Sequence, residues 1–138
     1  MKKSNLSILL VSTLLLSISC NKAIEQKQDD LIMKAITDGT WIVEQYFENG
    51  SNISYEFLNY DFKFSSNGTV IGAIAGDTTK GVWSGSSSTS SITSTFPTSA
   101  TPLVKLNAVW KIKDSYWDYV EAVTKIGSDS MVLHLRKK

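Results

Sequence analysis

The feature that most restricts how this chain can fold is an alternation of apolar and polar residues that recurs from Thr40 to the C-terminus. Successive side chains of a β-strand point to opposite faces, so a period of two predicts strands with one apolar and one polar face. The pattern is clearest in residues 60–64, 104–112 and 131–136. A sheet with one buried face and one wet face is typical of antiparallel β proteins. The repeated alternation therefore predicts an all-β fold.

Turn-forming residues separate these apolar runs. Asn67-Gly68 lies between two of them, and this dipeptide is the strongest short-range signal for a hairpin because both positions accept positive φ. Further breaks recur at intervals of roughly 10 residues, a spacing typical of sandwiches and barrels. We therefore expect an antiparallel up-and-down barrel of about eight short strands. The predicted strands are residues 40–48, 53–57, 60–65, 69–75, 80–84, 90–96, 103–113 and 116–135, with the last divided into two at Gly127.

One segment departs from the alternating pattern. Residues 84–101 are mostly serine and threonine, a composition that suits either a loop or a polar edge strand. We expect one short strand centred on Ile92, with a mobile loop on each side.

The N-terminus has the order of charge and hydrophobicity that is typical of a secretion signal. Lys2 and Lys3 are followed by a nearly continuous apolar run from Ile8 to Leu16. The small residues Ser17 and Ser19 then flank Ile18 before Cys20. This progression predicts a signal peptide over residues 1–19. The apolar run is shorter than the roughly twenty residues that a membrane-spanning helix needs, so a permanent transmembrane anchor is the less favoured interpretation.

The end of this segment resembles bacterial lipoprotein signals, in which a small residue precedes the cysteine that is acylated, as Ser19 precedes Cys20 here. Ser17 stands where that family usually has leucine. The resemblance implies that Cys20 carries the lipid and that the membrane is a partner of the protein through it. Asn21, in the place of an aspartate, implies the outer membrane by the same resemblance, on either its periplasmic or its outer face.

A tether and a short helix are expected between the lipid and the barrel. Residues 21–28 are polar and lack periodicity, as in a linker, so residues 20–28 are expected to comprise the lipidated Cys20 and its tether. A short amphipathic helix is predicted from Asp29 or Asp30 to Ile36, ending at Asp38-Gly39. The chain is 42% apolar and 20% charged, which suits one folded domain, here residues 29–138.

Three segments resemble the small lipocalin-like domains of bacterial lipoproteins: Gly39-Thr40-Trp41-Ile42-Val43, the stretch from Phe62 to Thr69, and Gly81-Val82-Trp83-Ser84. The likeness covers residues 38–84, and strand pattern alone extends it further. It implies that Trp41 packs across the closed end of the barrel, with Arg136 as the basic residue above it. An eight-stranded barrel either fills with its own side chains or holds one small ligand, and the sequence leaves both open.

The sequence lacks the residues that several kinds of functional site require. The chain has one histidine, His134, and one cysteine, so no zinc site is predicted, and no cofactor is expected. Residues 81–85 read Gly-Val-Trp-Ser-Gly, which is not the spacing of a hydrolase nucleophile. The carboxylates fall on predicted solvated faces, so we expect no enzymatic activity. The formal charge of +1 also argues against binding to nucleic acid.

The aromatic residues are the remaining candidates for a functional role. Trp41, Trp83 and Trp110 share the phase of apolar neighbours and are expected in the core. The run Tyr116-Trp117-Asp118-Tyr119 puts aromatics on both faces of one predicted strand, so one face is expected to reach solvent, a cavity or a partner. The candidate ligand or partner contacts are therefore Trp83, Trp110, Tyr116, Trp117 and Tyr119.

Two functions follow from these expectations. The first is binding or sequestration of a small apolar molecule inside the barrel. The alternative is an interaction module that binds a protein or glycan through its outer surface, with a filled interior. A cavity above a few hundred Å³ would favour the first, and a filled barrel with an exposed apolar patch would favour the second.

Overall fold

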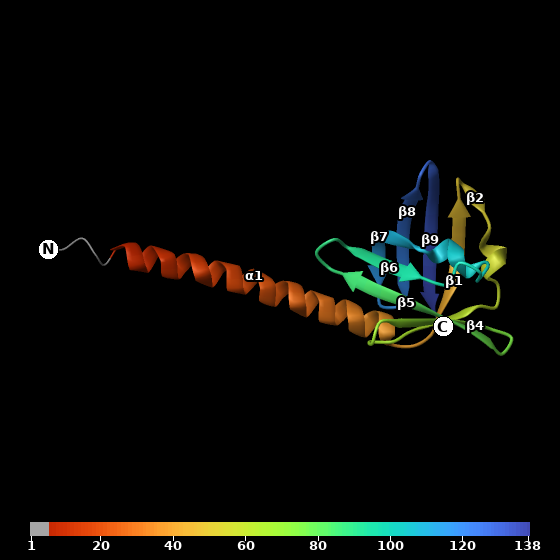
Figure 1. The fold of residues 1–138 in the computed structure, drawn as a ribbon, viewed down its shortest axis with the longest axis horizontal. Coiled ribbons are helices and arrows are strands. Elements are labelled where there is room, and N and C mark those ends of the chain that lie inside the picture. Colours follow the sequence, from red (N-terminus) through yellow and green to blue (C-terminus); the bar gives the residue numbers. More distant parts are fainter. Residues whose placement is uncertain (1–5) are drawn as a thin grey trace.

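The computed structural model describes the backbone of residues 6–138 and the side chains of residues 21–138. It consists of one long helix followed by a β-barrel (Figure 1). The predicted signal peptide begins outside the described backbone, and the Cys20 side chain lies outside the described side chains. The elements are α1 (Leu6–Thr37), β1 (Trp41–Glu48), β2 (Ser51–Asn52), the 3-10 helix η1 (Ser54–Phe57), β3 (Asp61–Phe64), β4 (Thr69–Ile74), β5 (Asp77–Ser86), β6 (Ser91–Thr95), the 3-10 helix η2 (Leu103–Leu106), β7 (Ala108–Tyr116), β8 (Tyr119–Ile126) and β9 (Asp129–Lys137).

The strands form the closed antiparallel barrel that the alternation predicts. From β3 to β9 each strand pairs with the next one in the sequence, β1 pairs with β3 through Trp41 and Phe62, and β9 returns to pair with β1 along most of its length. Eight strands thus close the barrel, and β2 is an additional strand on β1. The closure between β1 and β3 is short, because Trp41 and Phe62 are the one pair of residues that joins them, whereas β1 and β9 pair over most of their length.

Two predicted strands are corrected by the structure. Residues 53–57 were expected to be a strand, but they contain η1, which turns Phe57 into the core. Residues 103–106, expected to begin a strand over 103–113, form η2. A 3-10 helix has three residues per turn, so Leu103 and Leu106 lie on one side of η2, and both are buried. Burial of this pair explains why the segment leaves the extended conformation.

The Ser/Thr-rich segment is more regular than expected. β5 continues to Ser86, a tight turn follows, and β6 begins at Ser91 with Ile92 buried in the core. Strand pairing between Ser86 and Ser91 joins the two strands into a hairpin.

The helix is longer than the sequence pattern predicts. Residues 21–28 were expected to be an irregular tether, but they are part of α1. Only the C-terminal part of α1 lies against the barrel, and the rest projects away from it (Figure 1). Ile32 and Met33 pack on the core, and Ile36 is buried in it. Of the described residues, none forms a helix with both the length and the apolar character needed to cross a membrane.

Candidate functional site

The barrel interior is almost filled by its own side chains. It contains an apolar cavity of about 40 Å³, well below the roughly 300–1,000 Å³ of typical ligand pockets. Among the residues that line it, Ser94 alone is polar. The lining residues are Phe62, Phe64, Val70, Ile92, Ser94, Phe96, Leu106, Trp110, Val120, Ala122, Leu133 and Leu135. A cavity of this size and composition holds no drug-sized ligand without a rearrangement.

The connection between β6 and β7, residues 96–107, supplies part of this filling. Leu103 and Leu106 are buried, and Leu103 packs so closely on β4 that a Cβ at Gly72 would lie 2.9 Å from its Cδ1 atom. The carbonyl of Leu106 accepts hydrogen bonds from Ser94 Oγ and Trp110 Nε1. The connection is therefore held in the barrel by both packing and buried hydrogen bonds, and we call residues 96–107 the plug.

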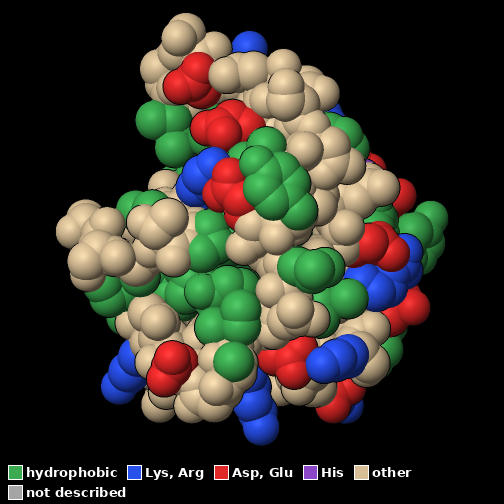
Figure 2. All heavy atoms as spheres, turned by 90° about the vertical axis from the view of Figure 1, so that its right-hand side faces the viewer, with side chains coloured by type: hydrophobic (Ala, Val, Ile, Leu, Met, Phe, Trp, Pro, Cys, Tyr) green, Lys and Arg blue, Asp and Glu red, His purple; other side chains and the backbone are tan. Residues whose placement is uncertain are grey.

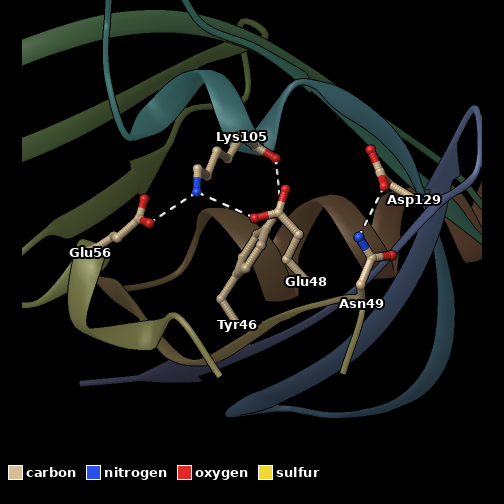
Figure 3. A network of polar contacts seen from close by, with 6 residues as sticks. All are labelled: Tyr46, Glu48, Asn49, Glu56, Lys105 and Asp129. Carbon is tan, nitrogen blue, oxygen red and sulfur yellow. Dashed lines mark hydrogen bonds and ion pairs between the residues drawn. The ribbon is translucent and has the colours of Figure 1, made fainter. Parts of the chain in front are cut away.

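Lys105 ties the plug to the barrel wall. Its Nζ atom lies 2.9 Å from Glu56 Oε1 and 3.4 Å from Glu48 Oε2, and Tyr46 Oη donates a hydrogen bond of 2.9 Å to the Lys105 carbonyl (Figure 3). Partial burial disfavours the charged lysine, but the hydrogen bond and charge of Glu56 and the charge of Glu48 outweigh it and raise the pKa of Lys105. Burial, with the same two carboxylates, raises the pKa of Tyr46 to about 12.

Trp41 lies at the end of the barrel where α1 arrives. It is 1% exposed, and its Nε1 atom donates a hydrogen bond of 2.9 Å to the carbonyl of Ile36 in the last turn of the helix. The final carbonyls of a helix lack partners within the helix, so Trp41 joins the barrel to α1 by satisfying one of them. The ammonium group above the Trp41 ring belongs to Lys137, 5.1 Å from the ring centroid.

The assignment of Arg136 as the residue above Trp41 is therefore wrong. Arg136 is paired across the sheet with Ile42, whereas Lys137 is paired with Trp41. Neighbouring residues of a strand point to opposite faces, so Arg136 points outward. There its guanidinium makes a two-bond ion pair with Glu44, at 3.1 and 3.2 Å, and lies 4.5 Å from the centroid of the Tyr119 ring.

The predicted aromatic contact residues fall into two groups. Trp83 and Trp110 are buried, and Trp110 lines the cavity. Tyr116, Trp117 and Tyr119 lie at the hairpin that joins β7 and β8. The expectation that residues 116–119 form one strand is wrong, because Trp117 and Asp118 are the turn. Tyr116 is 67% exposed and Trp117 is 52% exposed.

A second pair of exposed apolar side chains lies on η1 and directly after it. Tyr55 is 71% exposed and Leu58, which follows η1, is 67% exposed. On the side of the barrel away from α1, Figure 2 shows hydrophobic side chains among charged ones.

Sequence reasoning missed Lys137, Lys105 and Tyr46. Lys137 follows the end of the alternating run, and its side chain is 11% exposed although lysine is rarely buried. Its Nζ atom also lies 3.3 Å from the Ala35 carbonyl and 3.4 Å from Asp38 Oδ2. Within the described residues, no cluster of three His, Cys, Asp or Glu side chains is arranged to hold a metal ion.

A crystal structure of a DUF4847 family protein from Bacteroides vulgatus is similar to this chain, with a TM-score of 0.54 and 12% sequence identity. The match covers 74% of this chain and 95% of that chain. At this identity the likeness shows a shared barrel fold alone. No family model and no curated protein matches the chain.

Proposed function

We propose that this protein is a lipoprotein of the outer membrane in which a filled barrel serves as an interaction module. In this proposal Cys20 carries the lipid, and the partner binds the outer surface of the barrel. The observation that carries the proposal is the cavity inside the barrel, whose volume of about 40 Å³ is too small for a typical ligand. No catalytic step is part of the proposed role.

The lipid anchor is supported by the charged, apolar and small-residue order of residues 1–19 and by the Ser19-Cys20 pair. Expression of the full chain in a Gram-negative bacterium that is fed an alkyne-bearing fatty acid tests it. We expect the full chain to take up the label and to sediment with outer membranes. We expect Cys20→Ala to lose both properties. Equal labelling of the two proteins would contradict the anchor.

The outer surface is supported as the binding face by the hairpin of Tyr116 and Trp117. Exposed rings at a turn bury little area within the fold, and aromatic residues are enriched at protein interfaces. Most of the other large aromatic side chains, including Trp83 and Trp110, already fill the core.

Binding of a small apolar molecule is the second candidate function. It is favoured by the lining of the cavity, which is apolar except for Ser94, because such a lining suits an apolar ligand. This function requires the plug to leave the barrel, which would break the contacts of Lys105 with Glu48 and Glu56.

Tryptophan fluorescence separates the two functions. A protein of residues 21–138 is titrated with laurate, with circular dichroism as the test of folding. The filled barrel predicts no saturable change in emission. Saturable one-to-one quenching that is reduced in Trp110→Phe would place laurate beside Trp110, and would replace the interaction role by carriage.

A further inference from the structure

Four aromatic rings follow one another across the outer wall of the barrel. The centroids of Phe47 and His134 lie 6.4 Å apart, those of His134 and Tyr119 lie 5.7 Å apart, and those of Tyr119 and Tyr116 lie 6.4 Å apart. The rings come from β1, β9, β8 and β7 in turn. We call this row the aromatic strip, and Tyr116 is its most exposed ring. Trp117 follows Tyr116 in the turn, and its ring packs on Lys137.

Charged side chains border the strip. Arg136 lies over the Tyr119 ring and is held by Glu44, and Asp118 Oδ2 is 3.8 Å from its Nη1 atom. Glu121 Oε2 is 4.0 Å from His134 Nε2. Each of these carboxylate side chains is at least 36% exposed. The border thus holds three carboxylates and one guanidinium, and its net charge is negative.

Cross-strand pairing accounts for only part of this arrangement. Tyr119 and Arg136 are direct partners on β8 and β9, and such pairs stabilise a sheet. Tyr116 ends β7 and Trp117 occupies the turn, a position that usually takes glycine, asparagine or aspartate. Lys137 covers one face of Trp117, and the side chain is still half exposed. Tyr116 and Trp117 therefore keep solvent-exposed surface that a ligand can contact.

We infer that the aromatic strip binds a neutral glycan. The face of an aromatic ring is electronegative and attracts the weakly positive C–H groups of a sugar ring. Ionised carboxylates only accept hydrogen bonds, so Glu44, Asp118 and Glu121 suit the hydroxyl groups of a sugar. The negative border repels phosphate, sulfate and uronate groups. This inference rests on the proposed interaction role, and it names the class of molecule that binds the outer surface.

Calorimetric titration of the full chain tests the inference. The protein is held in a zwitterionic detergent without a sugar headgroup, and is titrated with neutral β-1,4-linked hexasaccharides of glucose, mannose and N-acetylglucosamine. Hexagalacturonate is the charged counterpart. We expect saturable binding of a neutral hexasaccharide, at least tenfold tighter than binding of hexagalacturonate.

Single substitutions locate the site. Tyr116→Ala should weaken binding about tenfold, as expected for loss of one stacked ring. Glu44→Gln, which keeps the shape of the side chain, should also weaken it. Tyr55→Ala is the matched control, since it removes an equally exposed tyrosine from η1, and it should leave binding unchanged. Thermal melting followed by circular dichroism checks that each variant is folded.

Three results would overturn the inference: no neutral hexasaccharide binds, hexagalacturonate binds best, or Tyr55→Ala weakens binding as much as Tyr116→Ala does. Failure of the proposed function is a separate result, because it appears as saturable laurate binding inside the barrel. If neither laurate nor any of the three neutral sugars binds, the glycan inference is refuted. The interaction role then stands, with a protein as the partner.

Discussion

Replacement of Lys137 should destabilise the barrel more than replacement of its neighbour Arg136. The Lys137 ammonium lies 5.1 Å from the centroid of Trp41 and 4.5 Å from that of Trp117. It also contacts the Ala35 carbonyl and the Asp38 carboxylate at the end of α1. Lys137→Ala removes all of these contacts at once.

The size of the effect follows from burial. A partly desolvated cation over aromatic rings contributes about 1–2 kcal/mol, and its hydrogen bond to a helix carbonyl adds about 1 kcal/mol. We therefore expect Lys137→Ala to lower the free energy of unfolding by about 2–3 kcal/mol. For a domain of about 100 residues this lowers Tm by roughly 8–12 °C. Lys137→Met keeps most of the apolar stem and should lose about half as much.

Urea unfolding followed by tryptophan emission measures these losses, because Trp41 and Trp117 adjoin the site of the change. Arg136→Ala is the control. Its loss of unfolding free energy should be the smallest of the three, because Arg136 forms an exposed ion pair with Glu44 and such pairs contribute little. A loss in Arg136→Ala equal to that in Lys137→Ala would refute the assignment of Lys137 to the closed end.

Three further predictions concern the plug and the wall. Stability should fall as pH rises from about 10 to about 12, because Tyr46 ionises first in the unfolded chain when its folded pKa is about 12. Tyr46→Phe should show a smaller fall when urea unfolding is repeated across this range, and an identical fall would contradict the role of Tyr46. Leu103→Ala should lower the free energy of unfolding by about 2–5 kcal/mol, since it empties a buried site, and a loss below 1 kcal/mol would mean that the plug is not packed. Gly81→Ala should cost about 1–3 kcal/mol by overpacking, because its Cβ would lie 2.6 Å from the Thr95 carbonyl oxygen, and an unchanged Tm would contradict this contact.

The sequence was sufficient to predict most of the barrel because its strands carry period-two alternation and clear turn residues. The hairpin at Gly127 is the best example, since residues 116–135 were expected to divide there and β8 and β9 meet at that position. The two 3-10 helices were missed because short apolar segments fit more than one structure. In η2, Val104 and Leu106 satisfy alternation, whereas the buried pair is Leu103 and Leu106, and only the space inside the barrel decides between these patterns.

The candidate site was predicted less completely. The aromatic run at residues 116–119 was recognised as unusual, but its turn was not, because Trp117 occupies a position where glycine or asparagine would have signalled a hairpin. The basic residue predicted above Trp41 was Arg136, one position before Lys137, which the structure places there. A shift of one residue along a strand moves a side chain to the other face, and the register of β9 against β1 depends on contacts far apart in the sequence.

The central claim, that the interior is filled and the partner binds outside, is tested most directly by methyl resonances from the cavity wall. A protein of residues 21–138 with labelled leucine and valine methyl groups is titrated with laurate, and Val120, Leu133 and Leu135 are followed because they line the cavity. The filled barrel predicts that these three residues show no saturable shift up to the solubility limit of laurate. Saturable shifts confined to the residues that line the cavity would contradict the account and establish an internal ligand site.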